Sequence, residues 1–182
     1  MIQTSLYKDA LTNSMTFLGQ QPNTVFIGQQ VLWHGNPMST TIGDVPKEKM
    51  IETPVMEETQ LGMSLGLAMA GHKVVTFYPR WDFLICASNQ LVNHLDKIEY
   101  MSKGTMRPRV IIRTSIGPKS PLDGGPQHTA DYTQSFKDML TNTRIVSLNE
   151  PEEIFPAFEE ALLGDEFHST LLIENGAYYN DK

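Results

Sequence analysis

The amino-acid sequence predicts an α/β fold in three layers (α/β/α), with a mostly parallel sheet between two layers of helices. Short apolar runs alternate along the whole chain with longer amphipathic segments, which is the pattern of strands joined by crossover helices. Alternation of this kind favours parallel strands covered on both faces. The 182 residues suit one compact domain with a single core, which we expect to span residues 1–182.

Two helices and two strands are expected in the first half of the chain. Residues 3–20 carry apolar side chains on roughly one helical face, and TVFIG, residues 24–28, follows as the first strand. A second helix runs from Glu57 to about residue 70 and ends at Gly71, because glycine readily adopts the left-handed conformation of a helix C-cap. KVVTFY, residues 73–78, is the second strand.

The second half of the chain repeats this alternation. Apolar residues spaced by three and four predict one long helix over 83–103, closed by Gly104. Pro151 at a first helical position, after Asn149 as its cap, is a helix start signal. The other elements expected here are, in order, a strand over 109–113, a helix near 131–140, a strand over 144–147, a helix from 151 to about 163 and a strand over 170–174.

Two segments, 34–52 and 114–130, follow neither pattern and are expected to be irregular loops. Ligands on mostly parallel sheets bind beyond the carboxyl ends of the strands, so a site is expected in the loops after Gly28, Tyr78 and Arg113. Long loops inside compact domains are often functional.

Composition excludes several classes of function. A formal net charge of −7 and a pI near 5.2 leave no basic face, so we expect no nucleic-acid partner. The single cysteine, Cys86, cannot form an internal disulfide and lies in an apolar stretch that predicts a core helix. The chain has no apolar run of about 18 residues and no apolar centre of a signal peptide near its start, so we expect no membrane span and a cytoplasmic location.

The segment around Glu57 is the first candidate site. In the run Glu52-Thr-Pro-Val-Met-Glu57-Glu58, Pro54 closes an extended approach and a helix begins near Glu57. The helix dipole favours a charged carboxylate at this position. Acidic residues are also ordinary helix-start chemistry, which is the simpler explanation.

Two further loops carry candidate residues. Tyr78, Trp81 and Phe83 lie in an aromatic cluster at a strand end, which either caps the core or provides a flat apolar surface for a heteroaromatic ring. The segment SPLDGGPQH delivers His128 just before a helix. A loop histidine is often a solvent-exposed bystander, yet at the carboxyl edge of a sheet it is also well placed for proton transfer.

Taken together, these stretches resemble a known family. TPVME, LGMSLGLAMAG, the aromatic strand end, SNQLVNHLDKIEYMSKG and GGPQH look like the beta subunit of the thiamine-dependent decarboxylating component of 2-oxo acid dehydrogenases, with transketolases as more distant relatives. The resemblance runs from about Gly28 to the end of the chain. It implies a pyrimidine-binding domain with the fold predicted above and thiamine diphosphate as cofactor.

The resemblance also implies roles for particular residues. Glu57 matches the glutamate that hydrogen-bonds the aminopyrimidine of the cofactor, with Glu58 as the off-by-one alternative. A carboxyl group that shares a proton with the pyrimidine ring favours the imino form, whose nitrogen then removes the thiazolium proton. Trp81 or Phe83 would stack on the pyrimidine with Tyr78 nearby, and His128 matches a histidine that faces the substrate.

The sequence differs from the family pattern in three ways, and these differences bear on the function that we expect. Gln29 and Gln30 follow Gly28, where the family usually has an acidic residue that is part of an acidic chain between paired sites. Because the 182 residues suit one domain, we expect no counterpart here of the family's second domain, which helps dimerise the beta subunit and dock a lipoyl-bearing partner. The sequence also has no Gly-Asp-Gly followed by Asn, the pattern that holds metal and diphosphate.

The resemblance therefore predicts a subunit that is catalytic only with a partner. We expect a separately encoded diphosphate-binding subunit that holds Mg²⁺, a heterotetramer, and cleavage of a carbon–carbon bond next to a carbonyl with transfer of the acyl or ketol fragment. Two alternatives stay open: a two-subunit 2-oxo acid decarboxylase that releases an aldehyde, and a non-catalytic regulatory or vestigial domain. An arginine or histidine in the loops around His34 and Arg80 would suit a small anionic or sugar-like substrate.

Overall fold

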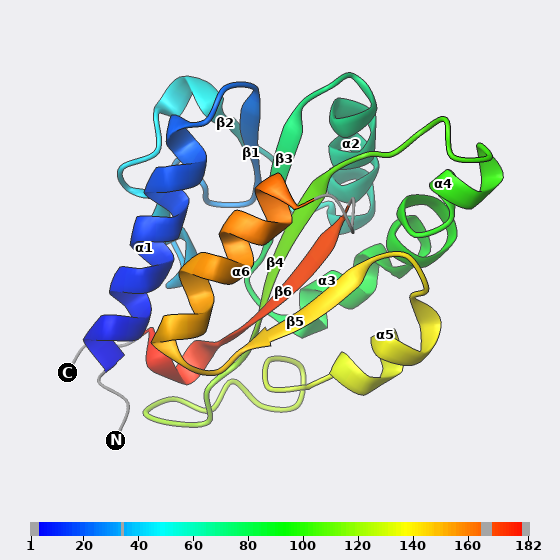
Figure 1. The fold of residues 1–182 in the computed structure, drawn as a ribbon. Helices are drawn as coiled ribbons and strands as arrows, with labels where there is room; N and C mark the ends of the chain where they lie inside the picture. Colours follow the sequence, from blue (N-terminus) through cyan, green and yellow to red (C-terminus); the bar gives the residue numbers. More distant parts are fainter. Residues whose placement is uncertain (1–3, 34, 165–168, 180–182) are drawn as a thin grey trace.

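The central sheet of the protein has six strands, all parallel, as the computed structural model shows for residues 4–33, 35–164 and 169–179. The strand order is β2-β1-β3-β4-β6-β5, and helices cover both faces (Figure 1). The predicted α/β class is therefore confirmed. The strands are β1 Thr24–Gly28, β2 Met50–Glu52, β3 Lys73–Tyr78, β4 Val110–Ile116, β5 Arg144–Leu148 and β6 Thr170–Asn175.

Helices of three kinds surround this sheet. The α-helices are α1 Thr4–Gln20, α2 Glu57–Met69, α3 Trp81–Leu84, α4 Ile98–Met101, α5 Thr133–Met139 and α6 Pro151–Leu163. Shorter 3₁₀ turns are η1 Met38–Ile42, η2 Lys47–Lys49, η3 Ile85–Ala87 and η5 Gly176–Tyr178, and η4 Gln90–Leu95 is a π-helix. Within the described ranges, no helix is both long and apolar enough to cross a membrane.

The core lies in two halves, one on each face of the sheet. Neighbouring strand residues contribute to opposite halves, as Phe26 and Ile27 do in β1, because successive side chains of a strand point to opposite faces. Helices α1 and α6, which lie side by side in Figure 1, close one half. Helices α2, α3 and α5 and the π-helix η4 close the other half.

A buried ion pair crosses the half of the core under α1 and α6. Arg113 on β4 donates to the Glu174 carboxylate on β6 through Nε at 2.5 Å and Nη2 at 2.8 Å, and neither side chain is exposed. Tyr179 donates to the same carboxylate, and Thr41 Oγ1 accepts from Arg113 Nη1 at 3.1 Å. Burial alone would lower the pKa of Arg113, but the Glu174 carboxylate raises it above its ordinary value. The network thus ties β4, β6 and the loop after β1 together.

The long helix expected over 83–103 is broken, which is a correction to the prediction. Helix α3 passes into the 3₁₀ turn η3, then the π-helix η4, and the chain returns to α-helix only in α4. The wide π-turn brings the Asp96 carboxylate to the backbone N–H groups of Thr141, Asn142 and Thr143, at distances of 2.8–3.1 Å. These hydrogen bonds join the segment to the start of β5 and offset the poorer helical geometry.

Three smaller corrections follow from packing. Cys86 is exposed and not in the core, because Leu84 and Ala87 occupy the buried side of the η3 turn. The segment 34–52 contains η1, η2 and the edge strand β2, which pairs with β1 from Phe26 opposite Met50. The residue before α6 is Glu150, not Asn149, and its backbone N–H donates to Glu153 Oε2 at 3.2 Å.

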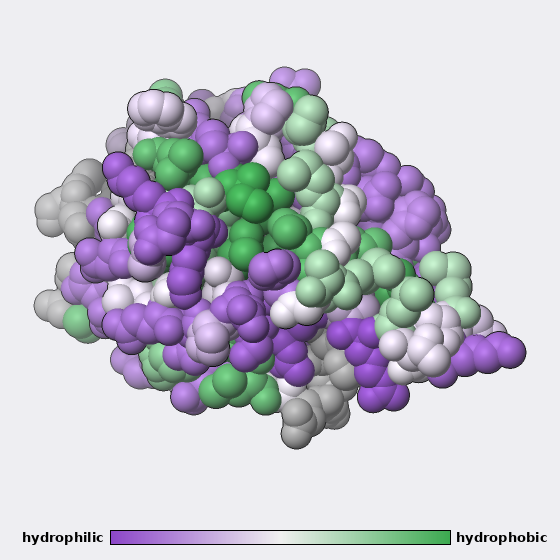
Figure 2. Space-filling model, turned by 90° about the horizontal axis from the view of Figure 1, so that it is seen from above, coloured by the Kyte–Doolittle hydropathy of each residue, from purple (hydrophilic) through white to green (hydrophobic). Residues whose placement is uncertain are grey.

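The two ends of the sheet differ in character. The loops after β1, β3 and β4 meet at the carboxyl end, at the bottom of Figure 1. The opposite end, seen from above in Figure 2, carries a group of hydrophobic residues in its middle with hydrophilic residues around it. The predicted site residues that the structure describes all come from elements at the carboxyl end.

Candidate functional site

Glu57 begins α2, directly beyond the carboxyl end of the sheet, and is half-buried. Its Oε1 accepts a hydrogen bond from Gln29 Nε2 at 3.2 Å, across from the end of β1. Its backbone carbonyl accepts from the Tyr78 hydroxyl at 3.3 Å, at the end of β3. Gln29 thus holds the carboxylate near the end of β1, and Tyr78 fixes the backbone of Glu57 at the end of β3.

A buried glutamine fixes the first turn of this helix to the sheet. Gln60 has no exposed surface, and its Nε2 donates to Thr76 Oγ1 and to the Phe77 carbonyl, both at 2.9 Å. Its Oε1 accepts from Thr53 Oγ1 at 3.3 Å. Gln60 is not among the residues predicted from the sequence, although a lone amide among the apolar residues of this helix is a signal that it has buried partners.

Glu58, the off-by-one alternative, faces a different element. Its Oε1 accepts from Asn89 Nδ2 at 2.8 Å and from Gln90 Nε2 at 3.4 Å, at the start of the π-helix. The two neighbouring carboxylates therefore diverge, one toward the ends of β1 and β3 and the other toward η4. This difference makes Glu58 a matched control for Glu57.

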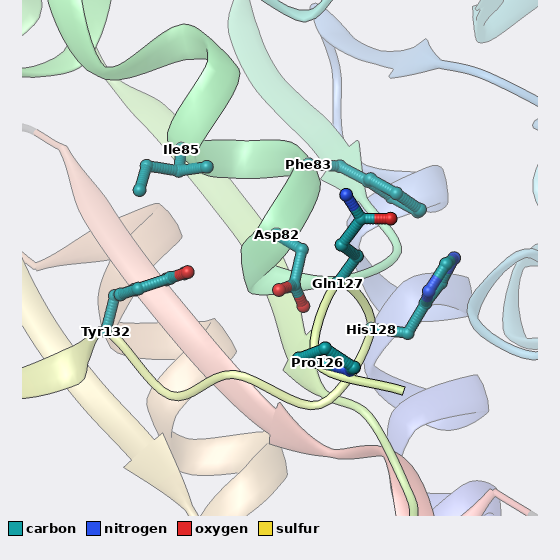
Figure 3. A pocket seen from close by; sticks show the side chains of 7 residues that line it. All are labelled: Asp82, Phe83, Ile85, Pro126, Gln127, His128 and Tyr132. Carbon is teal, nitrogen blue, oxygen red and sulfur yellow. The ribbon is translucent and has the colours of Figure 1, made fainter. Parts of the chain in front are cut away.

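Phe83 and His128 line one hollow at the carboxyl end (Figure 3). Their rings meet edge to face, with centroids 5.7 Å apart and an interplanar angle of 89°. The hollow has a volume of about 330 Å³, within the range of small-ligand pockets. Its other lining residues are Asp82, Ile85, Pro126, Gln127 and Tyr132.

The histidine is held by its own loop. His128 Nδ1 lies 3.0 Å from the Gly124 carbonyl, an acceptor, so this contact requires the hydrogen on Nδ1. In the neutral imidazole, Nε2 is then the acceptor. Gly117, just beyond β4, lets the loop approach closely, because a Cβ there would overlap the carbonyl oxygen of His128. The sequence predicted that a loop carries His128, and the close approach at Gly117 gives the backbone of this residue a defined position.

Trp81 and Tyr78 are buried, whereas Phe83 is only half-buried. Trp81 has no exposed surface and packs on Phe136 with centroids 5.0 Å apart, so its ring presents no face to a ligand. Of the two expected stacking residues, only Phe83 therefore reaches a hollow. Burial raises the pKa of the Tyr78 hydroxyl above its ordinary value, with smaller contributions from Glu57 and Glu58, so it acts here as a neutral donor. His34 lies outside the described residues.

Comparison with known proteins identifies the family. The family described as transketolase, pyrimidine binding domain, matches residues 4–180. This chain belongs to that family. The family resemblance seen in the sequence, to the pyrimidine-binding domain of thiamine-diphosphate enzymes, is confirmed.

Relatives of this pyrimidine-binding domain include two kinds of dehydrogenase subunit. The pyruvate dehydrogenase E1 component subunit beta of Chaetosphaeridium globosum is 24% identical over 176 residues, which cover 95% of this chain and 52% of that protein. The 2-oxoisovalerate dehydrogenase subunit beta of Bacillus subtilis (strain 168) is 26% identical over 140 residues, covering 75% and 41%. The chain thus spans about half, or less, of the length of these relatives.

A solved structure shares the fold of the domain. It is described as a split gene transketolase, inactive beta4 tetramer, and superposes with a TM-score of 0.70 at 16% identity, covering 95% of this chain and 52% of that one. At this level of identity the similarity shows the fold alone. Within the described ranges, no group of three or more histidine, cysteine, aspartate or glutamate side chains could hold a metal ion.

Proposed function

We propose that this chain is the pyrimidine-binding subunit of a two-chain thiamine-diphosphate enzyme. A separately encoded diphosphate-binding subunit would hold Mg²⁺ and complete the site, in a heterotetramer with cofactor at each chain interface. The reaction would be cleavage of a carbon–carbon bond next to a carbonyl, with transfer of the acyl or ketol fragment. The relatives support this proposal because they are subunits of 2-oxo acid dehydrogenases and of a transketolase.

One observation carries the proposal: at the start of α2, Gln29 donates to the Glu57 carboxylate, and Tyr78 donates to the backbone carbonyl of the same residue. Both donors lie on the side of the sheet ends, and the helix dipole favours negative charge there. A carboxylate fixed in this way is suited to hold a proton at a ring nitrogen of an aminopyrimidine. The half-buried ring of Phe83 offers the apolar face that such a heteroaromatic ring requires. The residues present therefore fit the pyrimidine end of the cofactor.

Each residue then has a separate task. Thiamine diphosphate, when bound, supplies the carbanion that attacks the carbonyl carbon of the substrate. Glu57 would hold and release the proton of the pyrimidine, Gln29 would orient its carboxylate, and Phe83 would exclude water from one ring face. His128, with Nε2 as an acceptor, would move a proton at the substrate.

The decisive test is cofactor binding by calorimetry with Mg²⁺, on this chain alone and mixed with the product of a neighbouring gene that carries the diphosphate motif. We expect binding only in the mixture. Glu57→Gln should weaken it by about 10- to 150-fold, the effect of losing a hydrogen bond that involves a charged group. Glu58→Gln should leave the affinity within about 3-fold, because Glu58 faces η4.

The other outcomes distinguish the alternatives. Tight binding by the isolated chain, or no binding by the mixture, would contradict the split-site proposal. Binding in the mixture with aldehyde release and no transfer would identify a 2-oxo acid decarboxylase. Normal turnover with Glu57→Gln would favour a non-catalytic domain. Because the similar transketolase chain is described as an inactive tetramer, the mass of each species should be measured by light scattering in the same samples.

A further inference from the structure

Arg80 is a cation at the candidate site that the proposed function does not use. It lies two residues beyond the end of β3, is half-buried, and forms no ion pair with any residue in the described ranges. The protein as a whole is acidic, with a formal net charge of −7. A partly desolvated cation that no described carboxylate contacts at ion-pair distance costs free energy, so its presence at a ligand-binding edge calls for a function.

The guanidinium is anchored at one nitrogen only. Nη1 donates to the Pro79 carbonyl at 2.7 Å and to Ser115 Oγ at 3.1 Å. Ser115 is itself buried and donates to the same carbonyl at 2.7 Å, which fixes the anchor to the ends of β3 and β4. Nε and Nη2 make no hydrogen bond with a described residue, and together they form the edge with which arginine binds planar oxyanions in two parallel bonds.

The anchored guanidinium lies beside the backbone of the histidine loop. Arg80 Nε is 2.9 Å from the position that a Cβ on Gly117 would take, and the carbonyl oxygen of His128 overlaps the same position. The side chain of Arg80 and the backbone of His128 thus lie close together, just beyond the end of β4. Burial lowers the pKa of Arg80 below its ordinary value, and the nearby Tyr179 and Asp82 partly offset this effect. This environment strengthens the attraction of Arg80 for an anion because less water screens it.

We infer that Arg80 binds the oxyanion of the substrate, a carboxylate or a phosphate, through Nε and Nη2. The inference rests on the proposed function, because it places the reacting carbonyl of that substrate near His128. Arg80 would thus determine substrate specificity, whereas the contacts proposed for the cofactor are made by Glu57 and Phe83. Substrates that carry an anionic group next to or beyond the carbonyl would be selected over neutral carbonyl compounds.

The test uses the complex with its diphosphate-binding subunit, loaded with thiamine diphosphate and Mg²⁺. Dissociation constants are measured by saturation-transfer NMR for two anionic probes, pyruvate and fructose 6-phosphate, and for their neutral counterparts, methyl pyruvate and fructose. Arg80→Met should weaken one anionic probe by about 10- to 100-fold and leave its neutral counterpart unchanged. The probe affected identifies the anion as carboxylate or phosphate.

Two more variants make the result specific. Arg80→Lys keeps the charge without the planar fork and should retain only part of the affinity, and it serves as the test if Arg80→Met does not fold. Arg107→Met removes an exposed arginine that pairs with Glu99 before β4, at the other end of the sheet, and should change neither probe.

Each remaining outcome has a defined meaning. Unchanged affinity of both anionic probes in Arg80→Met, or no binding of either by the wild-type complex, would overturn the inference. An equal loss of thiamine-diphosphate affinity in Arg80→Met would overturn it too, since Arg80 would then bind the cofactor's diphosphate. Failure of the wild-type complex to bind thiamine diphosphate would instead overturn the proposed function, and the two failures are therefore distinguishable.

Discussion

Asp96→Asn removes a buried negative charge that joins the broken helical segment to the start of β5. The residue is 1% exposed, and its carboxylate accepts from three consecutive backbone N–H groups, from the Thr141 hydroxyl and from Lys97. Burial alone would raise the pKa of Asp96. The hydrogen bonds from Lys97 and from the backbone outweigh it and hold this pKa at about 2, against an ordinary value of 3.8.

The size and the pH dependence of the effect follow from this shift. One pKa unit corresponds to about 1.4 kcal/mol, so the charged carboxylate contributes about 2 kcal/mol to the free energy of unfolding at neutral pH. Because the folded pKa is depressed, this contribution is complete above the unfolded value near 4. It is lost as the pH falls from about 4 toward 2. Asp96→Asn should therefore lower Tm by about 4–8 °C at pH 7 in a protein of this size.

The free energies of unfolding of wild type and of Asp96→Asn are measured by urea unfolding at pH 7 and pH 3, with circular dichroism as the signal. The stability gap between wild type and Asp96→Asn should shrink to about half at pH 3. Asp44→Asn, at an exposed aspartate, should show no gap beyond about 0.5 kcal/mol at either pH. A gap for Asp96→Asn that stays constant with pH would refute the reasoning, because it would then arise from packing and not from charge.

Three further substitutions test other parts of the structure. Gln29→Leu removes the donor to Glu57 and should raise the Kd of the complex for thiamine diphosphate by about 2- to 10-fold in calorimetry. Gly117→Ala forces the His128 backbone to move and should shift the imidazole NMR signals of His128, with about 1–3 kcal/mol of lost stability. Glu174→Gln leaves a buried arginine without its counterion and should cost about 3–5 kcal/mol in urea unfolding.

Controls and contrary results are available for each. Gly43 has open space around it and helical backbone angles, so Gly43→Ala should leave the free energy of unfolding unchanged, whereas Gly117→Ala should lower it. An unchanged Kd for Gln29→Leu would mean that Gln29 does not orient the candidate carboxylate. Unchanged imidazole signals in Gly117→Ala would contradict the close approach of the loop. A loss below about 1 kcal/mol for Glu174→Gln would show that water or another group compensates the arginine.

The repeating strands and helices were predictable because their signals are local. β1 and β3 occur at the predicted bounds, since each is a short apolar run between turn residues. The interior strands of a parallel sheet are buried on both faces, so their sequences stay apolar along their length. The start of α2 at Glu57 was equally readable, from a proline just before a helical pattern. The sequence by itself therefore determined the fold class and the carboxylate that begins α2.

Only the tertiary structure decided which of the predicted site residues face a ligand. Trp81 and Phe83 are two residues apart in one helical turn, and periodicity does not say which of them packs against α5. Periodicity likewise did not predict that Cys86 is exposed. The anchoring of Arg80 at Ser115 and the seating of His128 over Gly117 depend on the alignment of β3 with β4 and on a loop between distant positions. Such contacts join residues far apart in the chain, and no local pattern of residues encodes them.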